Sequence, residues 1–279
     1  MVSRIKQVTR FNLGALQWQN FSYYNQHKGK LGLSLASFLQ LKRYSSFYKR
    51  PLEVQFFDTV FNISSPFWFL HSVDEIFLEE VYRFKADVED PTIIDCGANI
   101  GLSIIYFKRL YPKAKILAFE ADPGICNILK KNVEVFGFSD ANIVHSAVWD
   151  ENSTLSFAQE GSVGGKIGDA GNGSEMIKVP AIRLSDYLNK PVDFLKIDIE
   201  GAEYRVLKDC WELLSNVKNL FIEYHLMPGE QSHLHEILNW VQTVGFSYYI
   251  KEAWSNMDYP FMKEYKDTFQ LQLNISCFR

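Results

Sequence analysis

The stretch from Thr92 to Glu120 constrains the fold of this 279-residue chain more than any other part of it. It opens on Thr-Ile-Ile, a short apolar run that is typical of a strand covered on both faces. Gly97 and Gly101 allow a tight turn into a helix over 102–111, which Pro112 ends. A second strand then ends at the glutamate, so a carboxylate should lie beside the carboxyl edge of the first strand. The pattern predicts an α/β fold with a mostly parallel sheet.

The turn after the first strand favours one nucleotide cofactor over another. A dinucleotide fingerprint requires Gly-x-Gly-x-x-Gly, whose backbone NH groups meet a pyrophosphate. Here Asp95 opens the turn, where a carboxylate would repel a diphosphate, and Ala98 and Asn99 replace the middle glycine. A carboxylate suits the ammonium and sulfonium groups of S-adenosylmethionine. Glu120 fits either cofactor, because a carboxylate that accepts both ribose hydroxyls is typical of adenosine sites. We therefore expect a methyltransferase rather than a dehydrogenase.

The next segments continue the same pattern. A helix begins at Asp122-Pro123 and ends at Gly137, and a third strand follows over 142–145. The exit of this strand should place small residues and backbone groups beside the adenine ring. The expected cofactor-binding residues are Asp95, Gly97, Asn99, Gly101, Glu120, Ala121, Ser146, Ala147 and Asp198.

A second group of charged residues ends a later strand. Lys196 and Asp198 share one face of this strand, where uncompensated charge would be expensive. They form either a paired ion couple or a functional site open to a ligand. The second interpretation is favoured, because Gly201 begins a helix at once and so leaves Asp198 and Glu200 at the sheet's carboxyl edge. Glu203, in the first turn of that helix, is interpreted as an acid that stabilises the helix dipole.

Four motifs, in order, resemble the FkbM family of S-adenosylmethionine-dependent methyltransferases. They lie at 95–102 (Asp-Cys-Gly-Ala-Asn-Ile-Gly-Leu), 120–123 (Glu-Ala-Asp-Pro), 195–203 (Leu-Lys-Ile-Asp-Ile-Glu-Gly-Ala-Glu) and 222–225 (Ile-Glu-Tyr-His). The resemblance implies a class I methyltransferase (Rossmann-like) fold: a seven-stranded, mostly parallel sheet with its last strand antiparallel and helices on both faces. It also implies methylation of hydroxyl groups on sugars of surface polysaccharides, glycolipids or secondary metabolites.

An oxygen acceptor requires a base at the rim, because its proton must leave as the methyl group arrives. A strand over 220–222 brings Glu223 and His225 to the same rim as Asp198. A histidine titrates near working pH, whereas an aspartate would need its pKa raised. We expect Asp198 or His225 to touch the acceptor, with Glu200 and Glu223 orienting that pair or the acceptor. A metal is the rival explanation for this cluster, but nothing in the spacing demands one.

Two other interpretations of the chemistry are less well supported. Methyltransferases that act on nucleic-acid bases typically follow this strand with two prolines and an aromatic residue, whereas Asp198 is followed by Ile-Glu-Gly. The glycine-rich stretch 161–174 lacks the Ser or Thr that a phosphate loop has after its lysine. We expect it to form a hairpin loop, with a lid over the acceptor as an alternative. A scaffold that keeps the cofactor fold without catalysis is the alternative function.

Charge is divided unevenly along the chain. Residues 1–50 contain nine Lys or Arg and no Asp or Glu, which leaves 20 of the 29 basic residues against all 33 acidic residues in the remainder. We expect a basic, aromatic-rich helical extension over 1–50 and a methyltransferase domain over 51–279, with 51–90 as a cover element and 91–279 as the catalytic core. The extension should pack on the acidic body or dock on a membrane surface; nucleic acid is not expected.

The expected location is cytoplasmic, with peripheral membrane contact as an alternative. No run approaches the roughly 18 apolar residues of a membrane span, and the start lacks the apolar core of a secretory signal. The four cysteines are far apart without metal-type pairing, so they should be reduced. The sugar, its hydroxyl and the oligomeric state stay open.

Overall fold

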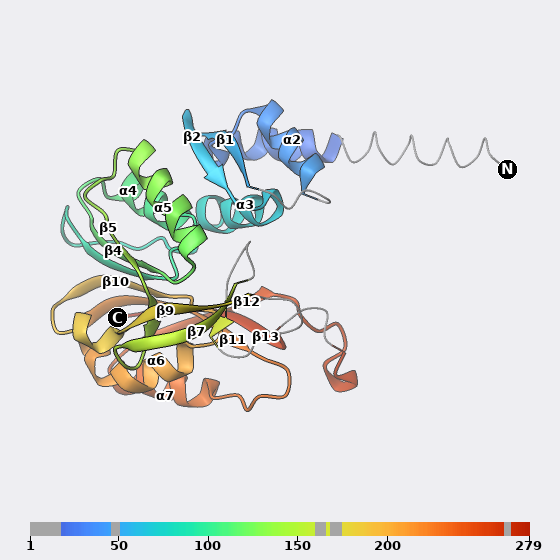
Figure 1. Ribbon diagram of the computed structural model, residues 1–279. Helices are drawn as coiled ribbons and strands as arrows, with labels where there is room; N and C mark the ends of the chain where they lie inside the picture. The colour runs from blue at the N-terminus through green and yellow to red at the C-terminus, as the bar shows by residue number, and fades with distance from the viewer. Residues whose placement is uncertain (1–17, 46–50, 160–165, 168–174, 265–268) are drawn as a thin grey trace. The chain divides into compact units, whose positions relative to one another are not determined.

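The computed structural model describes residues 18–45, 51–159, 166–167, 175–264 and 269–279. The chain divides into two compact units, Met1–Val81 and Tyr82–Arg279, each taken by itself below (Figure 1). The predicted glycine-rich loop lies outside the described residues, except for the short strand β8 (Lys166–Ile167). The functional division predicted after residue 50 stays a prediction.

The first unit combines helices with a β-hairpin. It contains helical residues 18–31, α2 (Leu35–Tyr44), β1 (Leu52–Phe56), β2 (Thr59–Ile63), α3 (Pro66–Val73) and a π-helical turn over Asp74–Leu78. The two strands pair antiparallel. The core is aromatic: the ring of Phe56 lies 5.3 to 5.4 Å, between centroids, from the rings of Phe61, Phe69 and Phe77. Large rings supply much buried apolar area in a unit of this small size.

Acidic residues that follow the β1–β2 hairpin contact part of the basic extension over 1–50. The Tyr23 hydroxyl donates to Asp74 at 2.7 Å, and Lys30 donates to Glu80 at the same distance. These contacts agree with the packing alternative for this part of the segment. The π-helical turn ends at Leu78, so Glu80 lies after it.

The second unit contains a large sheet and its covering helices. Its strands are β3 (Thr92–Cys96), β4 (Lys115–Glu120), β5 (Asn142–His145), β6 (Ala147–Trp149), β7 (Ser153–Gln159), β9 (Glu175–Arg183), β10 (Val192–Ile197), β11 (Val217–Leu226), β12 (Ser247–Trp254) and β13 (Leu271–Phe278). Its α-helices are α4 (Leu102–Leu110), α5 (Pro123–Val135), α6 (Glu203–Cys210) and α7 (Leu234–Thr243). Short 3-10 turns lie at Leu184–Tyr187, Trp211–Asn216 and Pro260–Met262.

Seven strands form one sheet in the order β12-β13-β11-β10-β3-β4-β5. Pairing is parallel from β11 through β10, β3 and β4 to β5, whereas β13 runs antiparallel to both β11 and β12. This confirms the seven-stranded class I fold with its last strand antiparallel. Strand order reverses at β3, which lies between β4 and β10, and ligands of open α/β sheets bind at such a switch point.

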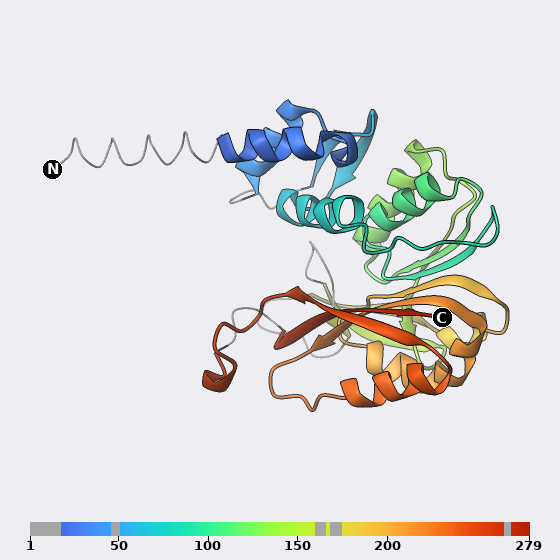
Figure 2. The same ribbon diagram turned by 180° about the vertical axis from the view of Figure 1, so that it is seen from behind.

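Helices cover both faces of this sheet, as predicted. Figures 1 and 2 show α4 and α5 on one face and α6 and α7 on the other. The segment before β3 adds aromatic packing, since Tyr82 and Phe84 contact Phe107 and Phe194 at centroid distances of 4.8 to 6.4 Å. Burial on both faces explains why the central strands are almost wholly apolar until they reach the site.

A second, four-stranded sheet has the order β6-β9-β7-β8. It has a small buried core of its own, made by Ala147, Phe157, Val179 and Ala181. A separate sheet is not among the predictions: β7 and β9 alternate polar and apolar residues as strands do, but local patterns do not show that they pair with each other and with β6. Its first strand continues directly from the exit of β5.

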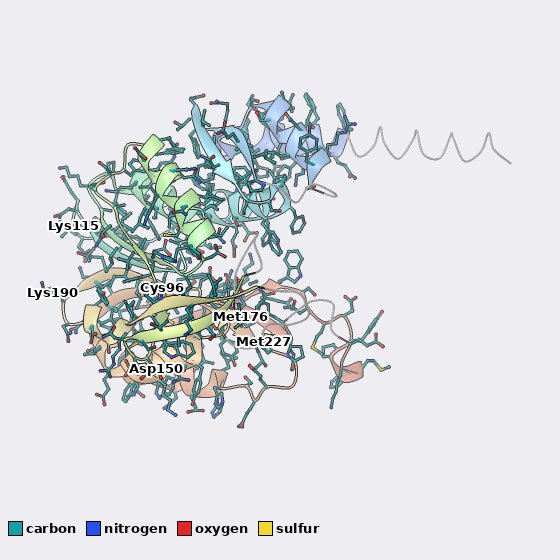
Figure 3. The ribbon with its side chains drawn as sticks, in the orientation of Figure 1. Cys96, Lys115, Asp150, Met176, Lys190 and Met227 are labelled. Atoms are coloured by element: carbon teal, nitrogen blue, oxygen red, sulfur yellow. The ribbon has the colours of Figure 1, made fainter. Side chains whose placement is uncertain are left out.

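Figure 3 shows which edge of the large sheet carries the carboxyl ends of the strands. Lys115, the first residue of β4, and Lys190, just before β10, lie on the side opposite Cys96, the last residue of β3. All four cysteines are buried and unpaired. No helix among the described residues is both long and apolar enough to cross a membrane.

Candidate active site at the carboxyl edge of the sheet

The turn after β3 is held against the loop after β10. Gly97 has φ +84°, and its NH donates to the carbonyl of Phe119 at 3.0 Å. A Cβ on Gly97 would lie 1.9 Å from the carbonyl oxygen of Asp198. The NH of Asp198 in turn donates to the carbonyl of Cys96 at 3.1 Å. Glycine is therefore required at 97 both for its conformation and for the close approach of two chain segments.

Asp95, predicted to bind the cofactor, lies below the surface of the rim. Its side chain is fully buried, with one oxygen accepting from the Ser103 hydroxyl at 2.5 Å and the other 3.2 Å from the ammonium of Lys196. The first oxygen accepts a hydrogen bond, whereas the second has an ion-pair contact but no hydrogen bond. The carboxylate supports the turn through Ser103 and Lys196, and its predicted contact with the cofactor stays a prediction.

Lys196 is the counter-charge of the rim. Its ammonium lies 3.2 Å from Asp95 and 3.1 Å from Asp198, and donates to the carbonyl of Gly97 at 2.8 Å. Burial disfavours the ammonium, but the carboxylates of Asp198 and Asp95 outweigh it and raise the pKa of Lys196 well above its usual range. The structure therefore shows Lys196 and Asp198 as a paired ion couple. The favoured interpretation, that they belong to a functional site open to a ligand, stays a prediction.

Glu120 ends β4 and is anchored by backbone NH groups. One of its oxygens accepts from Asn99 and the other from Asp122, each at 2.9 Å. Asn99 adopts φ +47°, which turns its NH toward the carboxylate. The side chain stays partly exposed, with lone pairs free of these two bonds for a diol. Burial raises the pKa of Glu120 to about 7.

The remaining predicted cofactor residues lie in the segments that follow β3, β4 and β5. Gly101 caps α4 at φ +96°, and a Cβ there would meet Leu129 at 2.8 Å. Ala121 accepts through its carbonyl from His145 at 3.0 Å if that ring nitrogen carries the proton. The Ser146 hydroxyl donates to Pro180, and Ser146 and Ala147 are buried. Ser146 therefore offers backbone groups, and not its hydroxyl, to a neighbour.

The four predicted catalytic residues come together around one imidazole. Nε2 of His225 lies 3.4 Å from Glu223 and 3.7 Å from Glu200. Atoms of Asp198, Glu200 and His225 all lie within 4.8 Å of one another. The side chains of Asp198, Glu200 and Glu223 are 15 to 23% exposed, whereas that of His225 is 1% exposed. The carboxylates therefore form the surface of the cluster, with the imidazole beneath them.

Glu203 belongs to this cluster, although the sequence analysis assigned it to the helix dipole. The residue is fully buried, and its carboxylate lies 3.1 Å from Nδ1 of His225. It also accepts from the backbone NH groups of Ile199 and Gly201 at 3.1 Å. The signal that could have identified it is its position two residues after Gly201, whose turn leaves the first residue of α6 beside the strand ends.

The charges of the cluster shift one another. Burial disfavours a charged imidazole, but Glu203, Glu223 and Glu200 together raise the pKa of His225 well above its usual range. Burial raises the pKa of Glu200 to about 8, opposed by His225 and reinforced by Asp198 and Glu223. The pKa of Glu223 is also raised, by burial and then by Asp198. These three acids therefore favour the protonated, imidazolium form of His225.

Asp198, Glu200 and His225 have the donor atoms of a divalent-cation site. In the protonated form that the neighbouring acids favour, the imidazole has no lone pair for a metal, so ligation would release that proton. The arrangement as it stands fits a network of acids around a cation. The expectation that the site needs no metal stays a prediction.

Comparison with known proteins assigns the family. The model of the methyltransferase FkbM domain matches residues 95–248, more than half of the 279 residues. The chain belongs to this family of methyltransferases. Family membership confirms the resemblance found in the sequence and S-adenosylmethionine as the cofactor.

Individual relatives are similar to this chain over part of its length. Methyltransferase 1 of Beauveria bassiana is 30% identical over 178 residues, which cover 53% of this chain and 71% of the relative. The 2-O-methyltransferase NoeI of Sinorhizobium fredii is 28% identical over 156 residues, which cover 48% of this chain and 63% of that protein. A crystal structure of methyltransferase FkbM from Methylobacillus flagellatus has a TM-score of 0.46 at 13% identity, with 75% of this chain and 54% of that chain covered.

The acidic residues at the rim fit this cofactor. A partly exposed glutamate ends β4, and three more partly exposed acids follow β10 and lie on β11. These acids pair with two positive side chains, Lys196 and His225, and both of these are buried. The excess negative charge suits a ligand that carries a sulfonium and an ammonium and disfavours a diphosphate.

Proposed function

We propose that the protein is an O-methyltransferase that methylates a hydroxyl group of a sugar, in a surface polysaccharide, a glycolipid or a secondary metabolite. The observation that carries the proposal is the cluster of Asp198, Glu200 and Glu223 over His225, next to the rim that Glu120 completes. Carboxylates grouped in this way can both orient a polyhydroxylated acceptor and take up a proton. The name of the relative NoeI, a 2-O-methyltransferase, agrees with an oxygen acceptor.

Bound S-adenosylmethionine supplies a methyl group on a positively charged sulfur, which keeps the electron pair of the broken carbon–sulfur bond. Glu120 would accept the ribose hydroxyls, since its carboxylate is already held in place by Asn99 and Asp122. Backbone groups of Gly97 and of residues 121 and 146–147 would line the rest of the cofactor.

The chain must hold the acceptor oxygen in line with the methyl group and remove its proton. Of the two expected bases, Asp198 is supported by exposure, because its side chain is 23% exposed and that of His225 only 1%. An imidazolium also has no free lone pair with which to accept a proton. We therefore assign the base to Asp198, oriented by Lys196, with Glu200 and Glu223 beside the acceptor.

The direct test is methyl transfer from isotope-labelled S-adenosylmethionine to a panel of free sugars, methyl glycosides and lipid-linked oligosaccharides. The expected result is a labelled methyl ether and one S-adenosylhomocysteine per methyl group, with both lost in Asp198→Asn. A protein that binds the cofactor but methylates no hydroxyl compound would contradict the proposal and favour the scaffold alternative.

Contact between residues 1–50 and a membrane surface belongs to the same proposal. Within 18–45 the described basic residues include Lys28, Lys30, Lys42 and Arg43, and Trp18 is 71% exposed. Basic side chains and an exposed aromatic ring on one segment suit anionic lipid headgroups. Sedimentation with vesicles that contain anionic lipid tests this part, and a lipid-linked acceptor would be presented at such a surface.

A further inference from the structure

One buried acid of the cluster has no place in the chemistry just described. Glu203 begins α6, where an acid that only complements the helix dipole would be exposed to solvent. It is instead fully buried, and its oxygens accept from two backbone NH groups and contact one ring nitrogen. A buried carboxylate is costly unless it is paired, so its place calls for a reason beyond the helix.

The backbone contacts of Glu203 flank Glu200. The two NH donors are those of Ile199 and Gly201, one on each side of that residue. Glu200 has φ +56°, a left-handed conformation that non-glycine residues adopt only when their surroundings impose it. By holding both neighbouring NH groups, the carboxylate of Glu203 maintains the conformation that brings the Glu200 side chain to His225.

The ring contact of Glu203 orients His225. Nδ1 lies 3.1 Å from the Glu203 carboxylate, which leaves Nε2 directed at Glu223 and Glu200. The ring also packs against Phe269, with 4.6 Å between centroids. A carboxylate that holds one ring nitrogen determines which way the other faces. One acid thus holds both the backbone conformation of residues 199–201 and the orientation of the His225 ring.

We propose that Glu203 is a positioning residue: through His225 and the 199–201 backbone it holds Glu200 and Glu223 at the acceptor pocket. The inference rests on the proposed function, because the acids it positions are those that would meet the acceptor. Glu203 itself touches neither the cofactor nor the reacting atoms.

The test compares Glu203→Gln and Glu203→Ala with a matched control. Glutamine keeps one oxygen acceptor but loses the charge and the second acceptor, whereas alanine loses all contacts. Glu236→Gln is the control, since Glu236 also contacts a histidine, His233 at 2.7 Å, but on α7 with a side chain 35% exposed. We expect kcat to fall about 10²-fold in Glu203→Ala, the size of effect that about 1 Å of misplacement causes. Glu203→Gln should recover part of this loss.

Both variants should bind S-adenosylmethionine within about threefold of wild type, because the expected cofactor residues other than Asp198 lie at or just after the ends of β3, β4 and β5 (a factor of 3 is roughly 0.65 kcal/mol). The control should keep wild-type kcat and affinity. Unchanged kcat in Glu203→Ala, or an equal loss in Glu236→Gln, would overturn the inference.

A second readout does not depend on catalysis or on the stability of the variants. In the wild-type protein, nitrogen NMR of labelled histidine, assigned with His225→Asn, should show a protonated, slowly exchanging Nδ1 for His225 at neutral pH. An unprotonated Nδ1 would overturn the inference even if the Glu203 variants did not fold. If the wild type methylates no hydroxyl compound, the proposed function fails, while the NMR result still decides the role of Glu203.

Discussion

The cofactor rim and the acid cluster are built by different means. At the rim, Gly97 and Glu120 are held by backbone hydrogen bonds to residues within about one βα unit. In the cluster, the acids are held by charge: His225 contacts three carboxylates that come from β11, from the loop after β10 and from α6. The first arrangement depends on local geometry, and the second depends on the balance of buried charge.

The comparison predicts that steric changes should damage the rim most. Gly97→Ala would force a Cβ to within 1.9 Å of the Asp198 carbonyl at φ +84°. Overpacking and the left-handed conformation together should cost about 2–5 kcal/mol of unfolding free energy. The matched control is Gly137→Ala, with φ +74° and open space around it, which should cost only about 1–2 kcal/mol. Urea denaturation measures both, and equal losses would show that the contact with Asp198 is unimportant.

Lys196 joins the two regions, so its removal tests both. Lys196→Met leaves Asp95 and Asp198 without their shared cation, and loss of one partner of a buried pair costs about 3–5 kcal/mol. We expect a lower midpoint of urea denaturation and weaker cofactor binding. Lys115→Met, which removes an exposed pair with Asp90, should leave the midpoint unchanged. A stable Lys196→Met protein would mean that the buried charges are balanced in another way.

A change of charge in the cluster should lower kcat more than it lowers the affinity for S-adenosylmethionine. Asp198→Asn should bind S-adenosylmethionine nearly as the wild type does, because Glu120 holds the ribose, while kcat falls about 10²–10⁴-fold through loss of the base. Titration calorimetry and single-turnover rates separate the two effects. A wild-type rate in Asp198→Asn would remove this residue from the chemistry.

The smallest expected effect is the pH dependence of cofactor binding. Burial raises the pKa of Glu120 to about 7, so the carboxylate that is proposed to accept the ribose hydroxyls should be ionised above this pH and protonated below it. The Kd for S-adenosylmethionine should rise by up to about tenfold as the pH falls from 8 to 6. Because its pKa in the folded state exceeds the unfolded value, Glu120 also lowers the stability of the ligand-free protein as pH rises from about 4.5 to 7.

Glu120→Gln is the control for this pH effect, since an amide does not titrate. Its affinity should be lower at pH 8 and should vary less with pH than that of the wild type. Parallel pH curves for the two proteins would assign the dependence to another group, including the amine of the ligand.

The same difference between local and distant contacts decides what could be predicted from the sequence. The turn after β3 and the acid at the end of β4 are determined by residues close together in the sequence. Their place at the rim therefore followed from the patterns of strand residues and glycines. Asp95 was expected at the same rim, but its burial depends on Lys196, a hundred residues away in the chain. A pattern of neighbours does not reveal which acid such a lysine will hold.

The cluster illustrates the limit further. The convergence of Asp198 and His225 followed from two adjacent strands that end at one edge. The preference for Asp198 as the base required the exposure of the two side chains, which is set by the packing of β11 and α6. Glu203 was overlooked because a first-turn acid is common at exposed helix ends, and its burial is a tertiary property.

The central claim, that this rim binds S-adenosylmethionine through Glu120 at the end of β4, is tested most directly by calorimetric titration. The wild-type protein should bind one cofactor per chain, and Glu120→Ala should bind at least about tenfold more weakly, as expected when hydrogen bonds to a charged group are lost. No binding by the wild type, or equal affinity in Glu120→Ala, would contradict the account.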